Sequence, residues 1–150
     1  MIIADTSGLL ALFNAREPAH AAVRDLVASE MEPLVVSPYV VAELDYLVAT
    51  RLGVAAELEA LRELAGGAYH LADLGPADLA TAAGLVERYR DQEVSVADAS
   101  IAVLADRHRT RSVLTLDRRH FAVLRPLSGG RFTLLPGSIG VSQARGRFAP

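Results

Sequence analysis

The 150-residue sequence contains no cysteine and no lysine. Without cysteine the chain can form neither a disulfide nor a thiolate metal site, and it has no cysteine nucleophile. No apolar run approaches the roughly 18 residues that a membrane-spanning helix requires, and the first residues lack the basic segment with which a signal peptide begins. These absences predict a cytoplasmic protein with no membrane partner.

Acidic residues are missing from the last part of the chain. All 18 lie at or before Asp117, so residues 1–117, with nine arginines, carry a net charge of −9, whereas residues 118–150, with six arginines, carry +6. An asymmetry of this kind indicates an anionic partner near the basic part, although a solvated basic tail explains it equally well. Aromatic residues are few and form no stacking stripe for single-stranded nucleic acid.

Five short apolar runs are present, at residues 1–4, 34–36, 69–72, 112–116 and 131–135, and they alternate with segments expected to be helical. Uninterrupted apolar strands separated by helices are typical of a parallel sheet covered on both faces. We therefore predict one α/β domain over residues 1–136, a short parallel β-sheet sandwiched by helices. Residues 137–150, with Gly, Ser and Arg, are predicted to form a flexible tail.

Three serines mark expected helix starts. Ser7 is expected to cap a first short helix, and Ser37, followed by Pro38, to open a helix that runs to about residue 50. Ser95 precedes Asp98 by three residues, which is the spacing of a capping box.

Two aspartates follow predicted strands. Asp5 ends the first strand and Asp117 ends the fourth. In open parallel sheets, functional groups gather beyond the carboxyl ends of the strands, so both aspartates are candidates for a site. A turn or capping role is the alternative for each.

Two further acids are expected to point inward from helices. Glu43 borders the apolar stripe of the helix opened by Ser37, and an acid placed toward an interior needs a partner, a metal ion or a proton. Asp98 shares a face with two alanines, although its capping position also suits the helix dipole. The alternative for Glu43 is a position at the edge of the stripe from which its carboxylate reaches water.

The four acids have no obvious cationic partner in the sequence. Converging carboxylates without compensation repel one another and raise one another's pKa values. A hard divalent cation such as Mg²⁺ removes that repulsion, because it prefers oxygen ligands and keeps several waters. The pattern therefore indicates metal-assisted hydrolysis of a phosphodiester.

Four segments together resemble the PIN-domain toxins of the VapC family: Asp5-Thr6-Ser7, Val41-Ala42-Glu43-Leu44, Val96-Ala97-Asp98-Ala99 and Leu114-Thr115-Leu116-Asp117-Arg118-Arg119-His120-Phe121. The resemblance runs in order from residue 1 to about residue 136, and the longer segments are similar to mycobacterial members. It implies an endoribonuclease toxin of a type II toxin–antitoxin system, which inhibits translation. The catalytic, metal-binding acids would be Asp5, Glu43, Asp98 and Asp117, with Mg²⁺ or Mn²⁺ as cofactor.

The resemblance also implies supporting roles and partners. Thr6 and Ser7 would lie beside the metal, although Ser7 would equally serve as a helix cap. Arg118, Arg119 and His120 are candidates for RNA contact, with a solvated turn and a surface histidine as the alternatives. A VapB-type antitoxin is the expected protein partner, bound by a homodimer of the toxin, and the helices near residues 19–28 and 54–64 are rich enough in apolar residues to form a groove for it. Related toxins cut tRNA or the sarcin–ricin loop of ribosomal RNA.

Two other functions remain open at this point. A non-catalytic module of the same fold would bind RNA or protein, although a pure binder has no need to assemble four like charges. A phosphohydrolase would use Asp5 as a nucleophile. Ser7 stands where phosphatases of the haloacid-dehalogenase type carry a second Asp, which disfavours that reading.

Overall fold

The computed structural model describes residues 1–137, so the predicted tail over 137–150 lies almost entirely outside the described residues. The elements follow in the order β1 (Ile3–Ala4), α1 (Thr6–Phe13), α2 (His20–Ser29), β2 (Val35–Val36), α3 (Pro38–Leu52), α4 (Val54–Ala65), β3 (His70–Leu71), α5 (Pro76–Arg88), the 3-10 turn η1 (Arg90–Gln92), α6 (Val96–Arg107), β4 (Ser112–Leu114), α7 (Arg118–Val123) and β5 (Thr133–Leu135). Within this part of the chain, no helix combines the length and the apolar character needed to cross a membrane.

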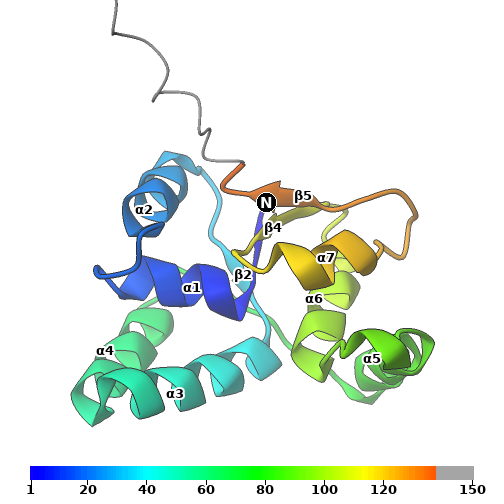
Figure 1. The fold of residues 1–150 in the computed structure, drawn as a ribbon, viewed down its shortest axis with the longest axis horizontal. Helices are drawn as coiled ribbons and strands as arrows, with labels where there is room; N and C mark the ends of the chain where they lie inside the picture. The colour runs from blue at the N-terminus through cyan, green and yellow to red at the C-terminus, as the bar shows by residue number, and fades with distance from the viewer. Residues whose placement is uncertain (138–150) are drawn as a thin grey trace, which may run out of the picture.

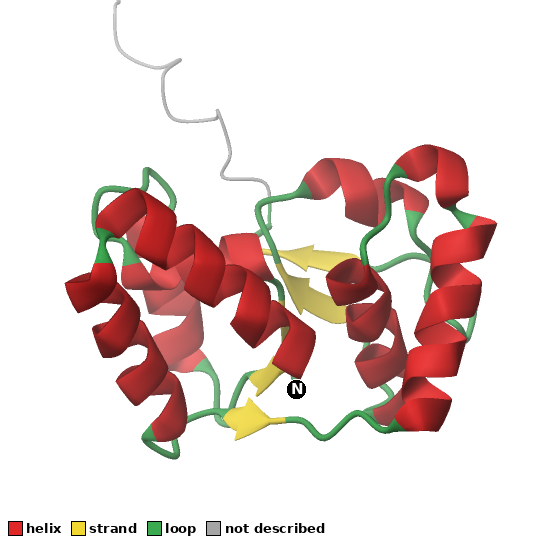
Figure 2. Ribbon diagram, turned by 90° about the horizontal axis from the view of Figure 1, so that it is seen from below, coloured by secondary structure: helices red, strands yellow, loops and turns green. Residues whose placement is uncertain are grey.

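The strands form one parallel sheet in the order β3-β2-β1-β4-β5. Ile3 of the central strand β1 pairs with Val35 of β2 on one side and with Val113 of β4 on the other. Helices cover both faces of the sheet (Figures 1 and 2), which confirms the predicted α/β sandwich. The strand order reverses between β1 and β4, and the carboxyl ends of strands at such a point are the usual place for a ligand.

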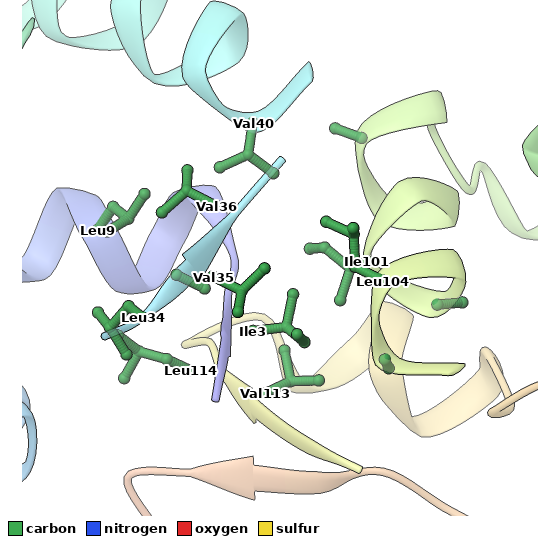
Figure 3. Packing of buried hydrophobic residues seen from close by; sticks show 14 of the residues in the cluster. Ile3, Leu9, Leu34, Val35, Val36, Val40, Ile101, Leu104, Val113 and Leu114 are labelled. Carbon is green, nitrogen blue, oxygen red and sulfur yellow. The ribbon is translucent and has the colours of Figure 1, made fainter. Parts of the chain in front are cut away.

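The core alternates between the two faces of the strands. Ile3, Val35 and Val113 lie on the face toward Ile101 and Leu104 of α6 (Figure 3). On the opposite face, Val36 and Leu114 lie toward Leu9 of α1 (Figure 3). All of these residues are fully buried, and burying an aliphatic side chain of this size contributes about 1.5–3 kcal/mol. Strands β2 and β4 are therefore fixed by packing on both faces of the sheet.

Helix α1 lies directly against β4. A Cβ atom added at Gly8 would be 2.5 Å from the carbonyl oxygen of Leu114, well inside van der Waals contact. Glycine therefore permits this approach. The close contact places the start of α1, which follows Asp5, beside the segment that follows β4.

Two of the three serines cap helices as predicted. The Ser37 hydroxyl accepts a hydrogen bond from the Tyr39 N–H at 3.2 Å, and Ser95 and Asp98 form a complete capping box. The prediction for Ser7 is wrong, because α1 already begins at Thr6 and Asp5 occupies the capping position. Helix α7, at Arg118–Val123, was not predicted.

Candidate active site

A cavity of about 300 Å³ brings all four predicted acids together. Its lining comes from the ends of β1 and β4 and from α1, α3, α6 and α7: Asp5, Thr6, Ser7, Leu10, Glu43, Leu47, Arg51, Glu93, Ser95, Asp98, Asp117 and His120. The cavity thus lies at the carboxyl edge of the sheet, beside the point where the strand order reverses.

Asp5 is the most buried acid of the site, with 4% of its surface exposed. Its Oδ2 accepts hydrogen bonds from the hydroxyls of Thr115 at 2.7 Å and Ser7 at 2.9 Å. Desolvation raises the pKa of Asp5, and the charge of Asp98 adds to that effect, while the two hydroxyl hydrogen bonds lower it in part. Desolvation outweighs the hydrogen bonds, so the ionised carboxylate needs a further positive partner.

A hydroxyl pair connects the two segments that follow β1 and β4. Ser7 Oγ lies 3.1 Å from Thr115 Oγ1 and accepts a hydrogen bond from the Leu116 N–H at 2.9 Å. Thr115 Oγ1 also accepts from the Asp117 N–H at 2.9 Å. Ser7 therefore orients Asp5 rather than capping a helix. Thr115 was not among the predicted site residues, although it stands two residues before Asp117.

Asp98 is positioned by the start of α6. Its Oδ2 accepts a hydrogen bond from the backbone N–H of Ser95 at 3.0 Å, and its own N–H donates to Ser95 Oγ at 3.1 Å. Only 8% of Asp98 is exposed. The capping interaction and an inward-facing carboxylate thus coexist in one side chain.

Asp117 and His120 form a local pair on α7. Asp117 Oδ1 accepts from the His120 N–H at 3.1 Å, which caps the helix, and its Oδ2 lies 2.9 Å from His120 Nδ1. The same nitrogen lies 3.7 Å from Asp98 Oδ2. His120 is half-buried in the cavity wall, so the expectation of a plain surface histidine is wrong.

Helix α3 supplies the opposite wall. Glu43, Leu47 and Arg51 follow one another at four-residue intervals and all line the cavity, as residues on one helical face do. Glu43 is exposed, so its carboxylate reaches water while it borders the cavity. Arg51 and Glu93 were missed by the sequence reasoning, and the spacing from Glu43 was the available signal for Arg51.

The two arginines suggested for RNA contact lie outside the cavity lining. Arg118 donates a hydrogen bond to the Pro136 carbonyl at 2.9 Å, which ties α7 to the end of β5. Arg119 is exposed. Of the three suggested residues, only His120 faces the carboxylates.

The donor set fits a hard divalent cation. Among residues 1–137, no three Asp, Glu or His side chains are arranged to hold a metal ion unaided, so such an ion would retain several waters, as Mg²⁺ commonly does. Desolvation is the main cause of the raised pKa of Asp5, and the charge of Asp98 adds to it because the two carboxylates repel each other. The hydroxyl oxygen of Thr6 is buried in the cavity wall without a hydrogen-bond partner in this part of the chain, and a metal-bound water would satisfy it.

Comparisons with known proteins agree with this geometry. The family model described as PIN domain matches residues 2–125. The chain is 63% identical over 135 residues to Ribonuclease VapC26 of Mycobacterium tuberculosis, a match that covers 90% of this chain and all of that protein.

Two solved structures share the fold. The crystal structure of Mycobacterium tuberculosis VapC20, described as a sarcin–ricin loop cleaving toxin, superposes with a TM-score of 0.75 at 23% identity, over 81% of this chain and 94% of that one. The structure of FitAcB from Neisseria gonorrhoeae gives a TM-score of 0.55 at 24% identity, over 81% and 91% of the two chains.

Proposed function

The chain belongs to the PIN domain family, and from that premise we propose that it is a metal-dependent endoribonuclease toxin of the VapC type. The observation that carries the proposal is the burial of Asp5 in a cavity that it shares with Glu43, Asp98 and Asp117. A desolvated acid facing other acids is costly for a folded protein. Such a cost is expected where the acids serve a cation and its chemistry.

In this proposal the four acids hold a Mg²⁺ ion through different kinds of contact. Asp5 and Asp98 would hold the ion directly, and Glu43 and Asp117 would complete the site through water. When bound, the ion lowers the pKa of a water nucleophile and stabilises the negative charge that develops on the phosphate. Mn²⁺ takes similar oxygen ligands and is a possible substitute.

The remaining polar groups fix the geometry. Thr115 and Ser7 hold the Asp5 carboxylate in one orientation, because both hydroxyls bond to its Oδ2. The Ser95 N–H does the same for Asp98, and His120 for Asp117. Cleavage in this scheme leaves 5′-phosphate and 3′-hydroxyl ends.

The proposed substrate is RNA, held near the site by the arginines that follow Asp117. Arg119 and Arg125 are exposed and free of ion pairs with the described residues, and phosphate contacts of this kind act on all sequences alike. The ribosomal sarcin–ricin loop is the first target to test, with tRNA as the second.

A VapB-type antitoxin is the proposed protein partner in the cytoplasm, bound by a toxin homodimer. A hollow lies between the end of α1 and helices α3 and α4, lined by Leu12, Phe13, Val48, Leu52, Ala56 and Ala60 together with the acids Glu59 and Glu63. It would accept a helix of the antitoxin. Helix α2 does not line this hollow, and its Val23 is fully buried in the core. The hollow is therefore a different surface from the groove expected between the α2 and α4 segments.

Cleavage by purified protein tests the proposal. With Mg²⁺, wild-type protein is expected to cut ribosomal RNA, and EDTA is expected to stop it. Asp98→Asn should lower the rate by about 10²–10³ or more, the usual cost of losing an electrostatic group at an active site. Asp106→Asn is the matched control, since Asp106 lies on the same helix but is exposed outside the cavity.

Cleavage that persists in EDTA or in Asp98→Asn would refute the metal mechanism. RNA binding without any cleavage would instead identify the non-catalytic module. A chain shortened to residues 1–137 should cut as the full chain does, if the domain proper ends near residue 136.

A further inference from the structure

We propose that Arg51 is a substrate-binding residue that holds a phosphate of the RNA adjacent to the one that is cleaved. The inference rests on the proposed ribonuclease function and deepens it, because it concerns how the same cavity receives its substrate. No motif in the sequence marks Arg51. Its place follows from the cavity that α3 forms with α1, α6 and α7.

The charges that line the cavity are strongly unbalanced. Five acids face it: Asp5, Glu43, Glu93, Asp98 and Asp117. Only Arg51 and His120 offer positive charge, and His120 is engaged with Asp117 at 2.9 Å. A polyanion that approaches this cavity is repelled unless cations at its rim offset the acids. A metal ion does so at the carboxylates, and Arg51 does so at the opposite end.

Arg51 is available for this role. It is exposed, and its guanidinium forms no hydrogen bond or ion pair with any described residue. Two other arginines, in contrast, are already paired: the Arg107 guanidinium lies 2.8 Å from the Asp78 carboxylate, and that of Arg24 lies 3.0 Å from Asp25. A free guanidinium presents a planar fork of N–H donors that matches two phosphate oxygens.

The position of Arg51 on α3 decides which phosphate it reaches. Arg51 lies two turns after Glu43, about 12 Å along the helix axis at 1.5 Å per residue. Leu47 stands between them, and Leu10 of α1 also lines the cavity. On the surface of α3, the position of Arg51 is thus separated from that of Glu43 by an apolar residue. The guanidinium binds a neighbouring phosphate while the scissile one lies at the acids.

An internal counter-ion role would have different consequences. If Arg51 served mainly to neutralise Glu43, its removal would change the stability of the metal-free protein and leave RNA binding with the same salt dependence. A phosphate contact, in contrast, contributes to the slope of log K against log salt, by about 0.7 for each contact to a single strand.

The test uses full-length protein and a fluorescein-labelled, 15-nucleotide single-stranded RNA of mixed sequence. Binding is followed by anisotropy at several salt concentrations in Mg²⁺, with Asp98→Asn in every protein to suppress cleavage. Arg51→Ala is compared with Arg62→Ala, which removes the same charge from an exposed position on α4 outside the cavity. Arg51→Lys keeps the positive charge but lacks the paired N–H donors of the guanidinium.

We expect Arg51→Ala to weaken binding about tenfold, equivalent to about 1.4 kcal/mol, and to lower the salt slope by about 0.7. Arg51→Lys should fall between Arg51→Ala and the parent, and Arg62→Ala should match the parent. With Asp98 intact, Arg51→Ala should raise KM for RNA cleavage and leave kcat nearly unchanged, as the loss of uniform substrate binding does.

A salt slope of Arg51→Ala equal to that of Arg62→Ala would overturn the assignment, as would a fall in kcat with unchanged KM. Cleavage by wild-type protein separates the two proposals. If wild type cuts RNA but Arg51→Ala binds like the parent, only the role of Arg51 fails. If the slope falls as expected but wild type cuts nothing, the RNA contact stands and the nuclease proposal fails.

Discussion

Thr115→Val removes one hydroxyl from the floor of the site and keeps the branched shape of the side chain. Thr115 is 1% exposed, donates to Asp5 Oδ2 at 2.7 Å and accepts from the Asp117 N–H at 2.9 Å. Burial already raises the pKa of Asp5, and the Thr115 hydroxyl opposes that effect more than any other group. The substitution should therefore raise the pKa of Asp5 further.

The size and sign of the stability change follow from this hydrogen bond. A bond to a charged group contributes about 1.5–3 kcal/mol, and one between neutral groups about 0.5–1.5 kcal/mol. Because burial raises the pKa of Asp5 in the folded state, its unfavourable contribution to stability is absent at low pH, where the group is protonated in both the folded and the unfolded state. It grows as the pH rises through the folded pKa. The free energy of unfolding lost in Thr115→Val should likewise grow as the pH rises through the folded pKa of Asp5.

Urea unfolding in EDTA, at about pH 4 and about pH 8, measures this difference. We expect Thr115→Val to lower the free energy of unfolding by about 1.5–3 kcal/mol at the higher pH and by less at the lower one. Thr81→Val is the control, because the Thr81 hydroxyl is exposed and bonds only to Ala77 O within α5. An equal loss at both pH values, or an undiminished loss in an Asp5→Asn background, would refute the role given to this hydroxyl. A smaller loss should remain there, because the Asp117 N–H also loses its acceptor.

Three further outcomes are expected. In thermal melts, Gly8→Ala should destabilise the protein by at least about 1–3 kcal/mol, because the new Cβ would meet the Leu114 carbonyl at 2.5 Å. The control Gly84→Ala, which has open space around it, should be neutral or stabilising. Asp5→Asn should unfold at higher urea than wild type at pH 8 in EDTA, since it removes a desolvated charge; a lower midpoint would contradict this. Mg²⁺ at 100 times its Kd should stabilise wild type by about 2.7 kcal/mol and Asp5→Asn by much less, which calorimetry can check.

Local signals explain the part of the site that the sequence predicts. Asp5 and Asp117 follow apolar strands, and the capping box of Ser95 and Asp98 spans only three residues, so each can be recognised from its neighbours. The parallel sheet follows likewise from short apolar runs between helices. The resemblance to PIN-domain toxins then assigned the four acids one common role.

The features of the site that the sequence did not predict depend on tertiary contacts. Ser7 looked like a helix cap, but the backbone enters α1 one residue earlier and the hydroxyl turns to Asp5 and to the segment after β4. Helix α7 begins with Arg118, Arg119 and His120, which carry no apolar periodicity, and Asp117 caps it. Thr115 joins the site through the pairing of β4 with β1, which no local pattern encodes. Arg51 joins it through the packing of α3, and its helical spacing from Glu43 was the one local signal.

The central place of β1 also bears on how the protein is made. Asp5 lies 110 residues before Thr115, yet its carboxylate bonds to that hydroxyl, and its backbone N–H bonds to the Leu114 carbonyl. Contacts between residues so distant in sequence form late, because a long loop must close first. A chain still emerging from the ribosome therefore holds its first acid without the partners that orient it. The arrangement of this acid is therefore completed only when β4 joins the sheet.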